Sequence, residues 1–328
     1  MILIVTNKLD PHADAVIGHL KSKGVGFARF NTEDFPQKIT FTWQGTDSAI
    51  EGVLQLPLGR KIGLSQITSC WYRRPVNPTI SGEIIAQQAK QFAEEEANFL
   101  LTGLWTYLAG CFWINYPLKI RQAESKINNL KLAAEIGFLI PRTLITNVPR
   151  EAKDFFHHCQ GKVINKVLGK GQVEYLKDYY FIYAHKVLPQ DLEKMGSVAY
   201  TPTLFQEYIP KKVEIRVTVV GEKIFSCEIH SQNSEKTIDD WRHYDLENVK
   251  HLVHQLPKSI ERLCLKIMER LDLNFATFDF ILTPEDKYVF LELNPNGQWL
   301  WIEQLAGLPI SQTIADLLIN RGEKINEK

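Results

Sequence analysis

Along the first third of the chain, strand-like alternation of apolar and polar residues repeatedly gives way to helix-like spacing. The apolar run at residues 2–6 predicts a strand, and the pattern over 12–23 predicts a helix. The alternation continues, with strands predicted at 26–31 and 68–73, a hairpin at 39–44 and 50–55, and a helix at 83–108. Strands that alternate with helices are typical of a parallel sheet in an open α/β layer.

The remaining two thirds follow a different pattern, in which glycine-flanked strands and paired strands dominate. Helices are predicted at 122–136, 150–159 and 259–271, and a strand at 162–168. Gly137 is a suitable C-cap for the first of these helices. The sequence contains no internal repeat, so a repeat architecture is not expected.

Length and composition describe an ordinary folded protein. The chain has 328 residues, of which 45% are hydrophobic and 23% charged, which indicates two domains, or three small ones, with a sizeable core. Lys and Arg total 38 and Asp and Glu total 38, so the net charge is zero. A general nucleic-acid binder usually carries a basic excess, so we expect no nucleic-acid partner, although a local basic pocket remains open.

Cysteine usage and hydropathy indicate a cytoplasmic protein without a membrane span. The five cysteines are odd in number and form no C-x-x-C motif, which favours a reduced chain. The opening MILIVT lacks a basic segment and is predicted to be a strand rather than a signal peptide. The uncharged stretch 97–118 is nearly long enough to span a bilayer, but Gly110, Asn115 and Pro117 interrupt it. We therefore predict a helix end, a turn and a buried strand there.

The clearest chemical pattern is a hairpin near the C-terminus, FATFDFIL-TPEDK-YVFLELNPN. A turn centred between Glu285 and Asp286 places Asp279 opposite Glu292. Successive side chains point to opposite faces, so one face is predicted to be wholly apolar: Phe278, Phe280, Leu282, Val289, Leu291 and Leu293. The other face holds Asp279, Glu292 and Asn294, together with Ile281 and Phe290.

Two opposed carboxylates need a stabilising partner. They repel by about 4 kcal/mol at about 4 Å with an effective dielectric constant of about 20. A shared proton, a basic neighbour or a cation would relieve this repulsion. With Asn294, the face offers three hard oxygen ligands and no thiol or imidazole, which suits Mg²⁺. A solvated acidic face is the simpler alternative.

A second hairpin, VEIRVTVVGEKIF, is predicted to place Glu214 and Arg216 on one surface. The alternate residues of its first strand are all apolar and point to the opposite side. Gly221-Glu222 fits a two-residue type II′ turn. A cross-strand ion pair on a wet face is an alternative to a binding role.

Taken in order, several short segments resemble those of the ATP-grasp ligases, a family that includes glutathione synthetase and the ribosomal-protein glutamate ligases. The matching segments are Lys126, Lys166, QEYI (206–209), EIR (214–216), DF (279–280) and ELNPN (292–296). A closer likeness is to the graspetide synthetases, the microviridin-type peptide macrocyclases. It is carried by WYRRP (71–75), DWR (240–242) and the GQW that ends at Trp299.

The resemblance implies a role for each matching residue. Lys126 and Lys166 would hold ATP phosphates. Those implied for the nucleoside are Glu207, Tyr208 and Ile209 at adenine and Glu214 at the ribose hydroxyls. The implied Mg²⁺ ligands are Asp279, Glu292 and Asn294, and the arginines near the γ-phosphate and the acceptor carboxylate are Arg216 and Arg242. The chain departs from many family members after Lys166, where LGKGQ stands in place of a Gly/Ser-rich phosphate loop.

Some of these residues have simpler interpretations. Lys126 is predicted on a helix, where a lone lysine usually lies at the surface. Arg73 and Arg74 end a predicted strand, and a domain-interface ion pair there is as plausible as a substrate contact. Trp299 and Trp301 are predicted to pack C-terminal helices rather than to stack on adenine.

The expected fold is α/β (α+β), an ATP-grasp fold with an N-terminal α/β domain at 1–117, a central lid domain at 118–204 and a C-terminal domain at 205–328. The expected function is an ATP- and Mg²⁺-dependent ligase that closes ester or amide rings on Glu or Asp side chains of a ribosomal precursor peptide. Alternatives are an amino-acid or protein-glutamate ligase and a non-catalytic nucleotide-binding module. A homodimer is a default expectation.

Overall fold

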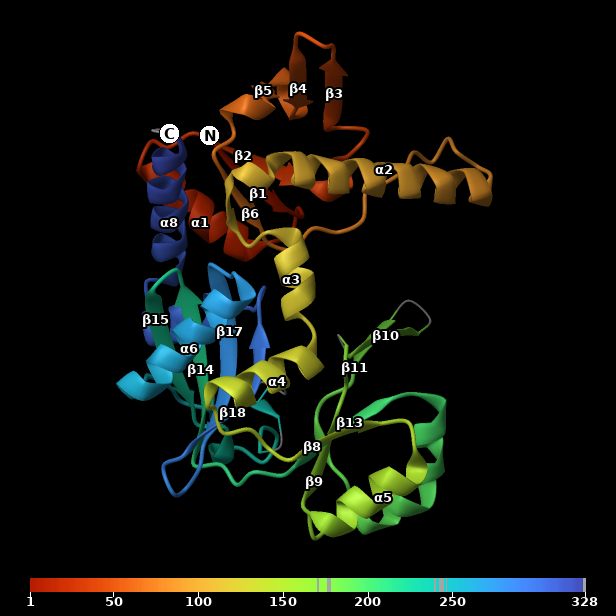
Figure 1. The fold of residues 1–328 in the computed structure, drawn as a ribbon, viewed down its shortest axis with the longest axis vertical. Coiled ribbons are helices and arrows are strands. Elements are labelled where there is room, and N and C mark those ends of the chain that lie inside the picture. The colour runs from red at the N-terminus through yellow and green to blue at the C-terminus, as the bar shows by residue number, and fades with distance from the viewer. Residues whose placement is uncertain (170, 176–177, 239, 242–244, 246, 327–328) are drawn as a thin grey trace.

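The computed structural model describes residues 1–169, 171–175, 178–238, 240–241, 245 and 247–326. Figure 1 shows one sheet near the N-terminus, a second sheet formed by the middle of the chain and a third formed by the last third. The long helix α2 (Gln87–Tyr107) projects to one side. Among the described residues, no helix is long and apolar enough to cross a bilayer.

The N-terminal sheet is parallel, as predicted, with strand order β2-β1-β6-β7. Its strands are β1 (Ile2–Thr6), β2 (Phe27–Asn31), β6 (Ser69–Tyr72) and β7 (Phe112–Ile114). A smaller antiparallel sheet extends from it and contains β3 (Thr40–Gly45), β4 (Ile50–Gln55) and β5 (Lys61–Gly63). Helix α2 packs on one face of the main sheet through Leu101 and Trp105.

The other face of the N-terminal sheet is covered by helices from both ends of the chain. Helix α1 (Pro11–Ser22) contributes Val16 and Leu20. Helix α8 (Ile310–Asn326) contributes Ile314 and Leu318 to the same core (Figure 1). The last helix therefore ties the C-terminal part of the chain to the first sheet.

The helix predicted at 122–136 is in fact two helices, α3 (Pro117–Ala123) and α4 (Lys126–Ile136). Ser125 separates them because its side chain accepts a hydrogen bond from the Asn128 backbone N–H at 3.3 Å and so caps α4. Gly137 ends α4 with a φ of +106°, as predicted. Lys126 is consequently the first residue of a helix.

The middle of the chain forms an antiparallel sheet of order β12-β9-β13-β8, flanked by α5 (Pro149–His158). Its strands are β8 (Thr143–Thr146), β9 (Val163–Lys166), β12 (His185–Lys186) and β13 (Thr203–Glu207). A separate ribbon pairs β10 (Gln172–Tyr175) with β11 (Asp178–Phe181). Strand β13 runs across residue 204, and the division into 1–117, 118–204 and 205–328 stays a prediction.

The C-terminal sheet is antiparallel, with order β16-β15-β14-β17-β18. Its strands are β14 (Val213–Val220), β15 (Lys223–Ile229), β16 (His251–Val253), β17 (Phe275–Leu282) and β18 (Tyr288–Asn294). Helices α4 and α6 (Lys258–Leu271) pack on the apolar face of this sheet. A short helix, α7 (Leu300–Ala306), follows β18.

The two hairpins of this sheet compare differently with the prediction. Strands β14 and β15 pair without interruption around Gly221-Glu222, and Gly221 has a φ of +59°, as a II′ turn requires. In the other hairpin Asp279 lies opposite Glu292, as predicted, but the register then shifts and Phe280 pairs with Phe290. The face prediction is therefore wrong beyond this shift.

The shift is a β-bulge, which places one extra residue in β18. Phe290 is completely buried in the core against Phe138 and Phe280, whereas Leu291 lines a cavity on the opposite face. Bulges re-aim side chains and are common beside functional sites. Here the bulge turns an aromatic ring into the core and a smaller apolar side chain toward the cavity.

Candidate active site

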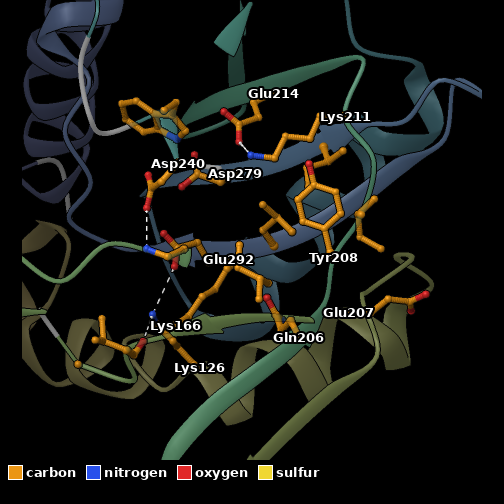
Figure 2. A pocket seen from close by; sticks show the side chains of 18 residues that line it. Lys126, Lys166, Gln206, Glu207, Tyr208, Lys211, Glu214, Asp240, Asp279 and Glu292 are labelled. Atoms are coloured by element: carbon orange, nitrogen blue, oxygen red, sulfur yellow. Dashed lines mark hydrogen bonds and ion pairs between the residues drawn. The ribbon is translucent and has the colours of Figure 1, made fainter. Parts of the chain in front are cut away.

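A cavity lies between the central sheet and the C-terminal sheet (Figure 2). It is lined by residues from β9, β13 and the segment after it, by the start of α4, and by the polar face of β14, β17 and β18. Its charged lining residues are Lys126, Lys166, Lys211, Glu207, Glu214, Asp240, Asp279 and Glu292. Residues separated by more than 160 positions in sequence therefore meet around one space.

The two predicted phosphate lysines face this cavity from different elements. Lys126 Nζ donates to the Val167 carbonyl at 2.7 Å and lies 3.6 Å from a Glu292 carboxylate oxygen (Figure 2). Lys166 is the last residue of β9 and lines the same cavity. The contacts of Lys126 replace the simple picture of a solvated helical lysine, because its ammonium group bridges the central and C-terminal sheets.

The segment predicted to read adenine follows β13 and borders the cavity. The Tyr208 backbone N–H donates to the Lys162 carbonyl at 2.9 Å, and the Lys186 ammonium lies 4.6 Å from the Tyr208 ring centroid. The Glu207 carboxylate points away from the acidic cluster in Figure 2 and lies 3.7 Å from Arg142 Nε. Glu207, Tyr208 and Ile209 all contribute to the lining.

Glu214 forms a buried ion pair that the sequence did not suggest. Lys211 Nζ donates to the Glu214 carboxylate at 2.5 Å, and both side chains are almost inaccessible to solvent. Burial raises the pKa of Glu214, and the ammonium of Lys211 opposes this rise. The adjacent Lys212 points instead to Asp286 in an exposed turn, so only the strand geometry distinguishes the two lysines.

Arg216 and Asp279 form a second ion pair beside the cavity. Arg216 Nη1 donates to both carboxylate oxygens of Asp279 at 2.7 Å, and Nη2 donates to the Gln298 carbonyl at 3.0 Å. The paired strands β14 and β17 place Arg216 directly opposite Asp279. This arginine supplies the basic neighbour that the opposed carboxylates Asp279 and Glu292 need.

Two predicted residues stand apart from the cavity lining. Asn294 lies on the same strand as Glu292, and its Oδ1 accepts the Asn296 backbone N–H at 3.0 Å. Arg242, the predicted second arginine, lies outside the described residues. Its neighbour Asp240, to which the sequence gave no role, lines the cavity and accepts the Ala184 backbone N–H at 3.0 Å. The prediction that Trp299 packs C-terminal helices is confirmed, because its ring is completely buried beside α8.

The donor set fits a magnesium-bound polyphosphate. The described part of the chain holds no group of three acidic, histidine or cysteine side chains arranged around a metal position. Asp279 and Glu292 supply two carboxylates, so a divalent ion would complete its shell with phosphate oxygens and water. The three lysines and five acids of the lining give a net negative cavity. A polyphosphate would therefore need divalent cations to bind there.

Comparisons with known proteins identify the fold. The MvdD pre-ATP grasp domain matches residues 1–121, and the RimK-like ATP-grasp domain matches residues 123–318. A search of curated proteins found no match. Among solved structures, the Chryseobacterium gregarium RiPP-associated ATP-grasp ligase in complex with ADP and a leader and core peptide is 30% identical, with a TM-score of 0.89. That match covers 98% of this chain and 96% of the other.

Two macrocyclases from Microcystis aeruginosa MRC are also similar. MdnC, bound with the precursor peptide MdnA, is 30% identical with a TM-score of 0.86, and the match covers 98% of this chain and 99% of MdnC. MdnB is 33% identical with a TM-score of 0.81, and the match covers 97% of this chain and 98% of MdnB. With a RimK-like domain over more than half of its length and these near-complete matches, the chain belongs to the ATP-grasp ligases.

Proposed function

We propose that this protein is an ATP- and Mg²⁺-dependent ligase that activates Glu or Asp side chains of a ribosomal precursor peptide and closes ester or amide rings. The observation that carries the proposal is one cavity in which lysines from two sheets face paired carboxylates on β17 and β18. The near-complete match to a RiPP-associated ligase bound to ADP, leader and core peptide supports it.

We assign the nucleotide to this cavity. Lys126 and Lys166 would neutralise the phosphates, and the 207–209 segment would border the adenine. Glu214, held by Lys211, would accept hydrogen bonds from the ribose hydroxyls. Asp279, Glu292 and Asn294 would hold Mg²⁺, which when bound offsets the charge of the phosphate oxygens.

The reaction needs no protein nucleophile. A substrate carboxylate oxygen attacks the γ-phosphorus of ATP, and the bond between that phosphorus and the bridging oxygen breaks to release ADP. The resulting acyl phosphate is then attacked at its carbonyl carbon by a hydroxyl or amine, which loses a proton, and inorganic phosphate leaves. Arg216 lies beside Asp279, where its fixed donors can stabilise negative charge on the transferring group; Arg242 is assigned the same task at the acceptor carboxylate.

The partner in this proposal is a precursor peptide with a leader and an acidic core. MdnC was solved with its precursor peptide, which supports this assignment. We place the protein in the cytoplasm because all five cysteines are unpaired. A homodimer stays a prediction.

The test is incubation with ATP, Mg²⁺ and a candidate precursor peptide, followed by mass spectrometry and an ADP assay. Ring closure removes one water per ring, so the peptide should lose whole multiples of the mass of water while ADP is released. Added glutamate residues would instead indicate a tagging ligase. Nucleotide binding without substrate-dependent ADP release would indicate a non-catalytic module.

A further inference from the structure

The carboxyl ends of the N-terminal strands hold an unusual occupant. In open α/β sheets, ligands bind in the crevice beyond these ends. Here the chain's own loop 295–299, which directly follows β18, contacts side chains from three strand ends. We call this segment the post-β18 loop. The parallel sheet therefore contacts the segment that continues from the proposed metal ligands.

Arg73 makes the strongest of these contacts. It follows β6 and is completely buried, and its Nη1 donates to the carbonyl and to the Oδ1 of Asn296 at 2.6 and 3.0 Å. Its Nε and Nη2 have no hydrogen-bond partner among the described residues. Burial, together with the neighbouring Arg74, lowers the pKa of Arg73 to about 9, so the guanidinium stays charged near neutral pH.

A buried charge with unsatisfied donors is costly. Unpaired donors cost about 1–3 kcal/mol each, and more when charged. An apolar side chain of similar volume would avoid this cost. The retention of an arginine at this position therefore points to a task other than stability.

Two further side chains hold the same loop. Asn115, just after β7, donates to the Pro295 carbonyl at 2.8 Å. His12 Nε2 accepts the Trp299 backbone N–H at 3.3 Å, and the His12 ring contacts the Trp299 ring edge-on at 5.0 Å. The N-terminal sheet thus contacts the post-β18 loop near its beginning, middle and end.

The loop in turn connects to the proposed metal and phosphate groups. The Asn296 backbone N–H, next to the atoms that Arg73 holds, donates to Asn294 Oδ1 at 3.0 Å. The Gln298 carbonyl accepts Arg216 Nη2, and the same arginine holds Asp279. At Gly297 a Cβ atom would lie 1.8 Å from Thr277 Oγ1, so the loop packs directly on β17. A displacement of the loop would therefore turn the Asn294 amide.

We propose that Arg73 is a positioning residue that acts through Asn296 to hold the Asn294 amide oxygen toward Mg²⁺. The N-terminal sheet then takes part in assembling the metal site from outside the cavity. This inference rests on the proposed Mg²⁺–nucleotide site, but it does not depend on which peptide is modified.

The test compares Arg73→Lys with the matched control Ser69→Ala. Ser69 is also buried on β6 and also contacts a distant segment, since its Oγ donates to the Leu318 carbonyl at 2.7 Å, but it does not touch the post-β18 loop. ADP binding is measured by calorimetry over a series of Mg²⁺ concentrations, with thermal melting to confirm folding. Loss of an outer contact to a metal ligand typically costs about 10- to 100-fold in metal affinity.

We expect Arg73→Lys to raise the Mg²⁺ concentration for half-maximal ADP binding by about tenfold, while Ser69→Ala leaves it unchanged. A folded Arg73→Lys variant with the wild-type Mg²⁺ requirement would overturn the proposal. If Arg73→Lys does not fold, His12→Gln and His12→Leu test the same loop. Gln keeps an acceptor for Trp299 and should retain the wild-type requirement, whereas Leu should raise it. Equal requirements in both folded His12 variants would also overturn the proposal.

The two proposals can fail separately. ADP binding requires no peptide, so a wild-type protein that binds Mg²⁺ and ADP but modifies no peptide contradicts the proposed function alone. A variant series without any change in Mg²⁺ requirement contradicts the positioning role alone.

Discussion

The N-terminal and C-terminal sheets use their polar side chains in opposite ways. The parallel sheet places Arg73, His12 and Asn115 at its strand ends, where each contacts the protein's own post-β18 loop. The antiparallel sheet places Glu214, Asp279 and Glu292 within strands, where they face a cavity. In one region the polar partners are fixed backbone groups, and in the other they are available to a ligand.

This difference separates positioning from binding. A side chain that contacts backbone in a buried loop fixes geometry, and its loss changes how well another group is held. A side chain that faces a cavity can change partner when a ligand enters. Variants in the two sheets should therefore differ in what they alter, and the following predictions use that contrast, beginning with the largest effect.

The largest effect is expected at the proposed metal ligands. Glu292→Gln and Asp279→Asn should reduce peptide-dependent ADP release by about a hundredfold or more, because the phosphates lose the carboxylates that hold their cation. The control is Asp286→Asn in the exposed turn of the same hairpin, which should keep activity. If both carboxylate variants release ADP at the wild-type rate, the metal assignment is wrong.

The bulge in β18 predicts opposite effects at adjacent positions. Phe290→Ala should lower the free energy of unfolding by about 3–5 kcal/mol because it empties a fully packed core position. Leu291→Ala should change stability much less and instead raise the KM for ATP, because Leu291 lines the cavity. Denaturant unfolding and ATP kinetics on both variants test this, and the reverse order would contradict the register shift.

The buried pair of Lys211 and Glu214 should be strongly asymmetric with its neighbour. Lys211→Met leaves a buried carboxylate without its cation and should cost about 3 kcal/mol of unfolding free energy. Lys212→Met removes an exposed pair with Asp286 and should cost at most about 1 kcal/mol. Equal losses in urea unfolding would show that the burial of Lys211 has no energetic consequence.

The smallest effect concerns pH and His12. Burial, together with nearby Arg73 and Arg74, lowers the pKa of His12, and contact with Asp10 opposes this. The unfolded chain therefore binds a proton at a higher pH than the folded chain does. The resulting stability is complete above about pH 6.5, the ordinary histidine value, and declines as the pH falls below it.

His12→Gln should remove this part of the pH dependence. Between about pH 6.5 and about pH 5, the wild type should lose up to about 1.4 kcal/mol more per pH unit than the variant, as measured by urea unfolding. Parallel stability curves for the two proteins would show that His12 does not supply the proton linkage.

Local patterns predicted the strands and most of the site. Period-two alternation placed Asp279 opposite Glu292 and Glu214 beside Arg216, because pairing across a short turn is fixed by a few residues. The same reasoning failed at the bulge beyond Asp279, since one extra residue reverses the faces of everything that follows. The break between α3 and α4 was signalled by Ser125, a cap residue inside an otherwise helical pattern.

Long-range contacts could not be predicted in this way. Nothing local distinguishes Lys211 from Lys212, or marks Arg73 as a contact of residue 296, because each partner is chosen by how distant elements pack. The placement of α8 on the first sheet is of the same kind.

By itself, the sequence determined which segments form strands and helices and which acids share the polar face of the last hairpin. These features depend on backbone geometry over a few residues. Only the tertiary structure decided that Lys126 and Lys166 face these acids, and that the N-terminal sheet holds the post-β18 loop. Such contacts join residues far apart in the chain, and burial of apolar surface between elements brings them together.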